Sequence, residues 1–406
     1  MRQEDLLVGL DIGTSKMLCL VAKPKASGFD VIGVGEAPSR GMRKGSVIHI
    51  DETVESITAA VAKAEDDSGV SVEEAVVGIA GAYVSCRNSR GAMPVREREV
   101  KAADVVSVLE TAKAMPIPDD QQILHVLSQE FILDGQDNIQ EPVGMRGVRL
   151  EVKVHIVTAA TAPTENIVNC VKRCGIEVQD IVLQPIASAM SVLSEDEKAL
   201  GVCLVDIGGG TTDLAVYASG IILHTAVIPV AGDHVTNDIS VALRTPLREA
   251  EKLKHESGHA WAEAVPPEEK VLVPGVRGVN PGQVSRRYLA EVVSMRMEEL
   301  LKLVRNELHR ANLHSCLAAG VVLTGGSSLL PGMETLGEKV FEMPVRVGLP
   351  VYQGPKSEVV CSPRYSTGMG LLHMARRHWE KKPKQGKILS FGQIYAKMRR
   401  WFQDNF

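Results

Sequence analysis

The sequence predicts an α/β protein of two related lobes, because one strand–turn–strand motif occurs twice along the chain. The motif Asp-Ile-Gly-Gly-Gly-Thr-Thr-Asp at 206–213 lies between short apolar runs that predict buried strands. A partial copy, Asp-Ile-Gly-Thr-Ser at 11–15, lies between two similar runs. A third such run, 320–324, leads into the glycine turn at 325–326. At 406 residues the chain is too long for one hydrophobic core, so two or more domains are expected.

The composition is that of a globular protein with a basic tail. Hydrophobic residues make up 45% of the chain and charged residues 23%, which is ordinary for a globular domain. The seven cysteines are scattered, which favours free thiols in a reducing compartment over a disulfide framework. Residues 376–406 hold nine Lys or Arg against two acids, so the preceding body is acidic. With no secretory signal and no run of 18 apolar residues, we expect a cytoplasmic protein.

The first lobe begins with short strands around the first motif. A further buried strand is expected at 75–79. Residues 51–65 predict a helix with Asp51 as its N-cap, because Val54, Ile57 and Val61 share one face. Strands followed by a helix and another strand suit an α/β layer.

A separate unit is expected between two parts of the first lobe, from about residue 85 to residue 157. It begins with a charged stretch, continues with a helix at 102–114, and ends with strands at 123–133 and 148–157. Polar and glycine-containing turns separate the strands, so the unit reads as a small inserted subdomain.

The α/β order then resumes with a helix from 162 to Gly175, and Gln184-Pro185 opens another helix. The later expected elements are a charged helix at 247–255, a loop or short irregular hairpin at 264–287, a long amphipathic helix over 289–308, and a last core helix that starts at Thr367.

The stretch 255–259, His-Glu-Ser-Gly-His, formally matches a zinc-protease pattern, which requires both histidines on one helical face. Gly258 stands at the expected helix end, so a helix terminus is the favoured interpretation. The sequence has no Walker A pattern, and its glycine clusters fail the dinucleotide fingerprint.

The three glycine turns predict a phosphate-binding site. Glycine lets the backbone approach a ligand closely, and successive N–H groups and hydroxyls can surround phosphate oxygens. The aspartates beside two of the turns are suited to a divalent cation. A plain hairpin is the structural alternative for any one turn, but the three together favour a nucleotide site.

The motifs at 11–16, 206–213 and 324–328 resemble the two phosphate motifs and the adenosine motif of the actin/Hsp70/sugar-kinase superfamily. More closely, the chain resembles the FtsA family of bacterial cell-division proteins over nearly its whole length, including Pro38-Ser39-Arg40-Gly41-Met42, 142–144 and the tail. That family also has an inserted subdomain at the position of 85–157. The resemblance implies an actin-like two-lobed ATPase fold, made of duplicated ribonuclease H-like units.

The resemblance also implies roles for individual residues. Asp11 and Asp206 would bind Mg²⁺, largely through water. Gln184 and Asp213 occupy the positions that orient the attacking water in hydrolysing relatives; a polar helix start and a hairpin acid are their structural alternatives. At most weak ATP hydrolysis is expected. The nucleotide contacts implied are Gly13, Thr14, Ser15, Lys16, Gly208, Gly209, Gly210, Thr211, Thr212, Gly232, Asp233, Glu251, Lys254, Gly325, Gly326 and Ser327.

The C-terminal residues predict an amphipathic helix behind a basic linker. At 17 residues it is too short to span a bilayer, but it can lie in the interface with its cations toward anionic lipid. Docking onto the protein's own body is the alternative. The membrane-facing residues expected are Phe391, Ile394, Met398, Arg399, Arg400, Trp401 and Phe402.

By resemblance, the protein would bind ATP, polymerise at the cytoplasmic face of the inner membrane at the division site, anchor the FtsZ ring through the FtsZ C-terminal tail, and recruit later division proteins. No nucleic-acid partner is expected. The rival hypotheses are a small-molecule (sugar-type) kinase of the same superfamily, which needs an acceptor pocket, and an Hsp70-like chaperone, for which a substrate domain is missing.

The expected domains are a first lobe at 1–84 and 159–197, the inserted subdomain at 85–158, a second lobe at 198–230 and 301–375, a helical subdomain at 231–300 that holds the adenine side and docks the FtsZ tail, a basic linker at 376–388, and the membrane-targeting helix at 389–406.

Overall fold

The computed structural model describes residues 6–275 and 282–381. The predicted membrane helix at 389–406 lies outside the described residues, as does most of the predicted linker. None of the described helices is long and apolar enough to cross a bilayer.

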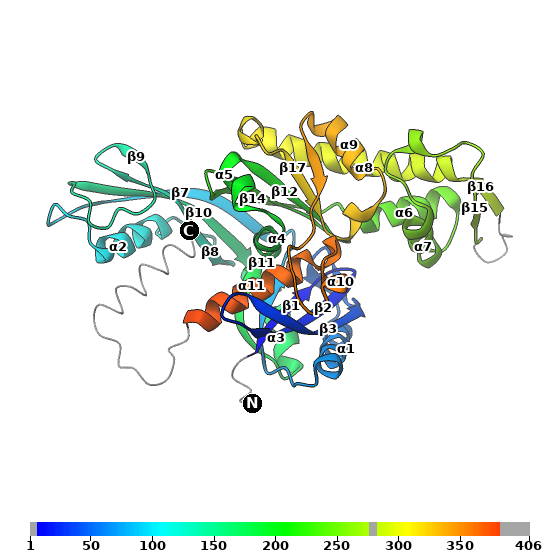
Figure 1. Cartoon of the computed structure of the whole chain (residues 1–406), viewed down its shortest axis with the longest axis horizontal. Coiled ribbons are helices and arrows are strands. Elements are labelled where there is room, and N and C mark those ends of the chain that lie inside the picture. Colours follow the sequence, from blue (N-terminus) through cyan, green and yellow to red (C-terminus); the bar gives the residue numbers. More distant parts are fainter. Residues whose placement is uncertain (1–5, 276–281, 382–406) are drawn as a thin grey trace.

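Two five-stranded sheets with the same topology form the centres of the two lobes (Figure 1). The first contains β3 (Phe29–Pro38), β2 (Lys16–Pro24), β1 (Leu7–Ile12), β6 (Glu74–Ile79) and β11 (Glu177–Leu183). The second contains β14 (Ile221–Ile228), β13 (Thr212–Ala218), β12 (Val202–Ile207), β17 (Val321–Thr324) and β18 (Val345–Val347). In each sheet the first three strands are antiparallel, and the last two continue in parallel. The prediction of two related lobes is therefore confirmed.

Helices cover both faces of each sheet. The first sheet packs against α1 (Ile50–Ser68) and α3 (Thr161–Arg173) on one side, and against α11 (Ser366–Lys381) on the other. The second sheet packs against α6 (Gly232–Leu243), α8 (Arg286–Arg310) and α9 (Met333–Phe341) on one side, and against α4 (Gln184–Val192) on the other. The remaining helices are α5 (Glu195–Leu200), α7 (Leu247–Ser257) and α10 (Ser357–Val360).

The inserted unit has a sheet of its own, which lies at the left of Figure 1. Its strands are, in spatial order, β7 (Val84–Pro94), β10 (Arg149–Ala160), β8 (Gln121–Leu133) and β9 (Gln136–Ile139). Helix α2 (Ala102–Lys113) covers it and shares its apolar core. Two short hairpins complete the strands: β4 (Met42–Arg43) with β5 (Ser46–Val47), and β15 (Lys270–Val273) with β16 (Gly282–Ser285).

Two sequence-based expectations about helix ends are corrected. The N-cap of α1 is His49, and Asp51 lies inside the first turn, where its carboxylate pairs with Arg173 at 2.8 Å and meets the positive end of the helix dipole. Helix α11 continues to Lys381, so the first part of the predicted basic linker is helical. Ala375 is buried in the core and Trp379 packs against it, and these contacts extend the helix.

Candidate nucleotide site

Three buried carboxylates meet between the two lobes. Asp11 lies near the end of β1, Asp206 near the end of β12, and Asp213 directly opposite Asp206 on β13. Their residues are only 7%, 8% and 3% exposed. Burial raises the pKa of Asp11 to about 7, against the opposing effect of Lys16 and with a further increase from Asp206. Burial likewise raises the pKa of Asp206 and, more strongly, that of Asp213.

Side chains from α4 and from the hairpin hold these carboxylates in place. Gln184 Nε2 donates a hydrogen bond to Asp11 Oδ1 at 2.8 Å, and Ser188 Oγ donates to Asp206 Oδ2 at 2.6 Å. Thr211 Oγ1 donates to Asp213 Oδ2 at 2.9 Å. The other oxygen, Asp213 Oδ1, is buried without a hydrogen-bond partner among the described residues. Gln184 and Asp213, the expected water-positioning pair, thus both reach this carboxylate cluster.

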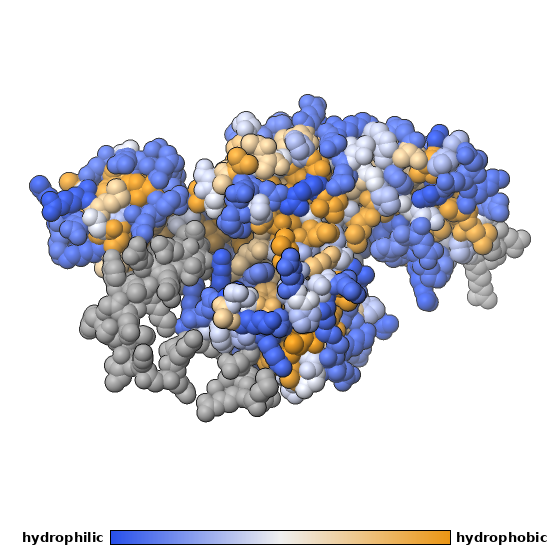
Figure 2. Space-filling model, viewed as in Figure 1, coloured by the Kyte–Doolittle hydropathy of each residue, from blue (hydrophilic) through white to orange (hydrophobic). Residues whose placement is uncertain are grey.

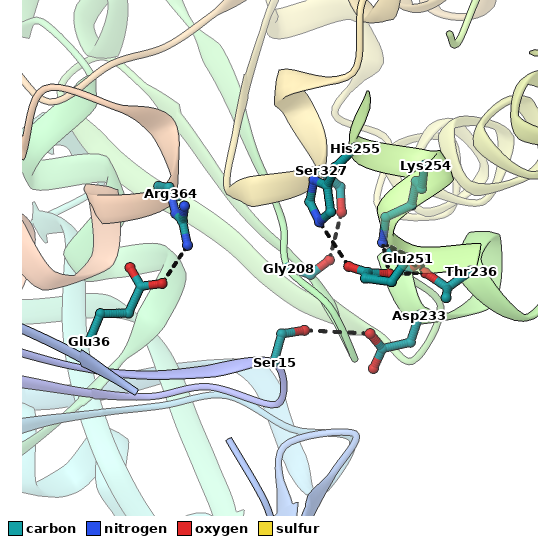
Figure 3. Close-up of polar contacts among 11 residues, drawn as sticks. Ser15, Glu36, Gly208, Asp233, Thr236, Glu251, Lys254, His255, Ser327 and Arg364 are labelled. Carbon is teal, nitrogen blue, oxygen red and sulfur yellow. Dashed lines mark hydrogen bonds and ion pairs between the residues drawn. The ribbon is translucent and has the colours of Figure 1, made fainter. Parts of the chain in front are cut away.

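The two glycine hairpins meet across the cleft. A Cβ atom on Gly209 would lie 1.7 Å from Ser15 Oγ, and one on Gly210 would lie 2.5 Å from Thr14 Oγ1. Ser15 Oγ also donates to Asp233 Oδ1 at 3.4 Å (Figure 3). Glycine is therefore required at these turns because the hydroxyls of the first hairpin occupy the space of a side chain.

This arrangement fits Mg²⁺ and a nucleotide. Lys16 opposes the raised pKa values of Asp11 and Asp206 but does not act on Asp213, so a divalent cation would stabilise the ionised forms of the three carboxylates. The unpartnered Asp213 Oδ1 is an available acceptor for a metal-bound water. Backbone amides and hydroxyls of both hairpins surround the same place, as phosphate oxygens require.

The expected adenine side is formed by α6, α7 and the turn after β17. Ser327 Oγ donates to the Gly208 carbonyl at 2.9 Å, and the Gly232 amide donates to the same carbonyl at 3.1 Å (Figure 3). A Cβ atom on Gly326 would meet no atom of the described residues within 4 Å, so a flat ligand has room there. Gly325 has a positive φ of 84°, and its Cβ would lie 2.3 Å from Asp206 Oδ1. The third turn thus touches the second phosphate turn.

Glu251 and Lys254 are tied to their own subdomain. Lys254 is buried, and its Nζ donates to the Gly232 carbonyl at 3.2 Å, to Thr236 Oγ1 at 2.9 Å and to Glu251 Oε2 at 2.7 Å. The other Glu251 oxygen bonds His255 Nε2 at 2.9 Å. Burial of Glu251 is outweighed by the hydrogen bonds and charges of His255 and Lys254, which lower the Glu251 pKa to about 2. Lys254 therefore positions the α6 N-terminus in this structure.

Lys16 contacts the segment that precedes α11. Its Nζ donates to the Arg364 carbonyl and lies 4.4 Å from the centre of the Tyr365 ring. Arg364 pairs with Glu36 at 2.5 Å, and Tyr365 donates to the same carboxylate at 3.1 Å. Burial lowers the pKa of Lys16, with Asp11 and Glu36 opposing that effect.

Sequence reasoning missed several residues of this site. Ser188, Thr367 and Thr236 carry hydrogen bonds to Asp206 or Glu251, but an isolated hydroxyl on a helix has no sequence signal. The Tyr83 hydroxyl was also missed; it is buried without a partner among the described residues, and Asp213 contributes to its raised pKa. Of these residues, only Thr367 is next to glycines, in the pattern Thr-Gly-Met-Gly, and such glycines are a sequence signal that another part of the backbone packs closely there.

The histidines of the zinc-protease pattern have separate surroundings. His255 bonds Glu251 on α7, which ends at Ser257. His259 lies beyond that end, and its Nδ1 accepts from the Trp261 amide at 3.0 Å. The two imidazoles do not share a helical face.

Comparison with solved structures identifies the fold. The PilM–PilN type IV pilus biogenesis complex matches with a TM-score of 0.65 at 16% identity, over 93% of this chain and 99% of that chain. MreB5 of Spiroplasma citri bound to ADP matches with a TM-score of 0.56 at 15% identity, over 94% and 99% of the two chains. The fold is therefore actin-like and two-lobed, with an inserted subdomain.

Sequence comparison then defines the family. A model for "Cell division protein FtsA" matches residues 203–370, and one for the "SHS2 domain inserted in FTSA" matches residues 81–158. Cell division protein FtsA of Pseudomonas aeruginosa is 48% identical over 99% of this chain and 98% of its own length. Cell division protein FtsA of Neisseria meningitidis is 42% identical over 100% of this chain and 100% of its own length. That of Escherichia coli is 39% identical over 99% of this chain and 98% of its own length. The chain belongs to the FtsA family of cell division proteins.

Proposed function

We propose that this chain binds Mg-ATP in the cleft, polymerises beneath the cytoplasmic membrane, and anchors the FtsZ ring there. The observation that carries the nucleotide part is the meeting of three buried carboxylates with two glycine hairpins between the lobes. Because each hairpin belongs to a different lobe, a ligand bound to both would hold the lobes together. ATP would thereby act as an assembly ligand, with weak hydrolysis at most.

In this proposal, the two hairpins hold the phosphates, Asp11 and Asp206 hold the metal through water, and the turn at Gly325–Ser327 faces the nucleoside. Mg²⁺ would neutralise phosphate charge. Gln184 and Asp213 would orient a water, since Gln184 already holds Asp11 and Asp213 has a free oxygen among the described residues.

The nucleotide proposal is tested with Asp11→Asn, which keeps an acceptor for Gln184 and removes the charge. We expect Mg-ATP affinity, measured by titration calorimetry, to fall at least tenfold. The matched control is Asp51→Asn, whose side chain is 84% exposed on α1 and pairs with Arg173 of α3. Magnesium-dependent binding that is equal in both variants would disprove the assignment.

The membrane part of the proposal rests on residues 389–406, whose apolar face and cations suit an anionic surface. Deletion of residues 388–406 should abolish flotation with phosphatidylglycerol vesicles while Mg-ATP binding persists. At single-residue level, Phe402→Glu should weaken flotation strongly, and Gln403→Glu, which adds the same charge beside it, should do so less. Unchanged flotation of the deletion variant would refute the tether.

The FtsZ tail is proposed to dock on the helical subdomain. Four of its elements carry exposed apolar side chains, and Figure 2 shows apolar groups on the surface of this subdomain at the right. These residues are Val241, Leu247, Leu272, Tyr288 and Met295. Met295→Glu should reduce co-sedimentation with an FtsZ tail peptide on vesicles, whereas Val351→Glu, which is 78% exposed against 67% for Met295 but lies outside the subdomain, should not. Equal effects would count against this docking surface.

The inserted subdomain is proposed to contact the neighbouring protomer and later division proteins. Val106 and Val148 are exposed on it, and its sheet projects to one side of the two lobes, at the left of Figure 1. Val148→Glu should reduce pelleting of polymers formed on vesicles with ATP. Normal pelleting would place the protomer contact elsewhere.

A further inference from the structure

A second polar cavity, of about 260 Å³, lies between α4, α5 and α11 and includes none of the proposed nucleotide contacts. It is lined chiefly by Glu195 and Lys198 of α5 and by His373, Arg376, Arg377 and Glu380 of α11. The four α11 positions are spaced as i, i+3, i+4 and i+7, so they share one face of the helix. The neighbouring positions Leu371, Leu372 and Ala375 are buried in the first lobe's core.

The cavity joins the two lobes. Helix α11 packs on the first sheet through Leu18 and Leu20, whereas α5 packs against β13 of the second sheet. Arg376 Nη2 also reaches the Ala26 carbonyl, in the turn between β2 and β3, at 3.5 Å. A ligand that contacted both walls would therefore touch both lobes.

Cations lie inside this cavity and carboxylates lie at its rim. Lys198 and Arg376 have side chains only 13% and 23% exposed, while those of their partners Glu195 and Glu380 are 84% and 47% exposed. The pairs measure 2.8 Å and 2.9 Å. Three basic residues, Lys198, Arg376 and Arg377, line the cavity against two acidic ones, Glu195 and Glu380, so the lining carries one more basic than acidic group.

Two further observations concern the basic side chains of this cavity. Arg376 Nε is buried and has no hydrogen-bond partner among the described residues, although buried donors are normally paired. Burial, together with Arg377, Arg376 and Lys198, lowers the pKa of His373 to about 4. All three cations are therefore close enough to act on one imidazole, which stays neutral at pH 7.

We propose that this cavity binds a phosphate group, supplied either by a phospholipid headgroup or by a free phosphate compound. Arginine guanidinium groups bind phosphate oxygens in pairs, and a lysine adds a point charge. The lipid source rests on the proposed membrane tether, whereas binding of free phosphate does not. Because Lys198 and Arg376 belong to walls from different lobes, bound phosphate would restrain the lobes from outside the nucleotide cleft.

The site is tested by titrating the full chain, saturated with Mg-ADP, with glycerol 3-phosphate and with inorganic phosphate. Lys198→Gln and Arg377→Gln should each weaken binding about fivefold, the scale of one basic residue near a phosphate surface. Glu195→Gln removes a rim carboxylate and should strengthen binding. Lys252→Gln is the matched control, because Lys252 forms the same i,i+3 pair with Glu249 on α7. Equal affinity in all variants, or no binding, overturns the free-phosphate form of the proposal.

Vesicles distinguish the two sources. With the full chain, Lys198→Gln should lower the affinity for phosphatidylglycerol vesicles about fivefold relative to Lys252→Gln if the headgroup is the ligand. Unchanged vesicle affinity with weakened glycerol 3-phosphate binding would assign the site to free phosphate. If neither readout changes, the cavity is not a phosphate site. If the full chain fails to bind vesicles at all, the tether is refuted while the phosphate titration still decides this proposal.

Discussion

The contact between Gly209 and Ser15 makes a sharp prediction about the closed cleft. A Cβ atom on Gly209 would lie 1.7 Å from Ser15 Oγ and 3.0 Å from Ser15 Cβ, so Gly209→Ala must either turn the Ser15 hydroxyl away from Asp233 or push the two hairpins apart. Overpacking of this kind costs about 1–3 kcal/mol. If nucleotide binding needs the closed arrangement, the affinity for Mg-ATP should fall about 5-fold to 150-fold. Anisotropy of a fluorescent ATP analogue measures this change directly.

A second substitution tests the cause of that loss. Ser15→Gly removes both clashing atoms, so the double variant Gly209→Ala with Ser15→Gly should lose less affinity than the two single variants together, with a coupling of at least about 1 kcal/mol. Gly282→Ala is the control, because its added Cβ meets no atom within 4 Å in the part of the chain that the structure describes. The reasoning is refuted if Gly209→Ala binds as well as the wild type, or if the losses of the two single variants simply add in the double variant.

Three other predictions concern stability. Tyr83→Phe removes a buried hydroxyl that has no hydrogen-bond partner among the described residues. The variant should therefore be more stable by about 1 kcal/mol, measured in thermal melts. A lower Tm would show that the hydroxyl has a partner. Burial, reinforced by nearby positive groups, lowers the pKa of His155 and of His373 to about 4, below their ordinary 6.5. Between pH 4 and pH 6.5 the unfolded chain therefore binds more protons than the folded protein. The free energy of unfolding should fall as the pH drops from 6.5 to 4, by at most about 3 kcal/mol per histidine. Urea titrations of His155→Gln should show a shallower fall, and an identical pH profile would contradict this. Gly325→Ala combines a positive φ with a Cβ 2.3 Å from Asp206 Oδ1 and should cost at least about 2 kcal/mol in urea midpoint analysis, whereas a neutral effect would mean that the turn relaxes.

Local pattern was sufficient wherever the deciding contacts lie within one element. Alternation and apolar runs predicted β6, β8 and β17, and helical spacing predicted α2 and α8, because side-chain periodicity depends only on neighbouring positions. The two Asp-Ile-Gly turns were recognisable for the same reason. Boundaries were less accurate: packing of Trp379 extended α11 into a stretch whose charges alone suggested a linker.

The sequence by itself determined the duplicated α/β units, their glycine turns and the aspartates beside them, since each is a short-range pattern. Only the tertiary structure decided what these groups touch. It placed Ser15 against Gly209, Ser188 on Asp206, Lys16 against Arg364 and Lys254 within its own subdomain. It also gathered α5 and α11 into a cationic cavity. These partners are far apart along the chain, so their meeting depends on how whole lobes pack, which no local pattern encodes.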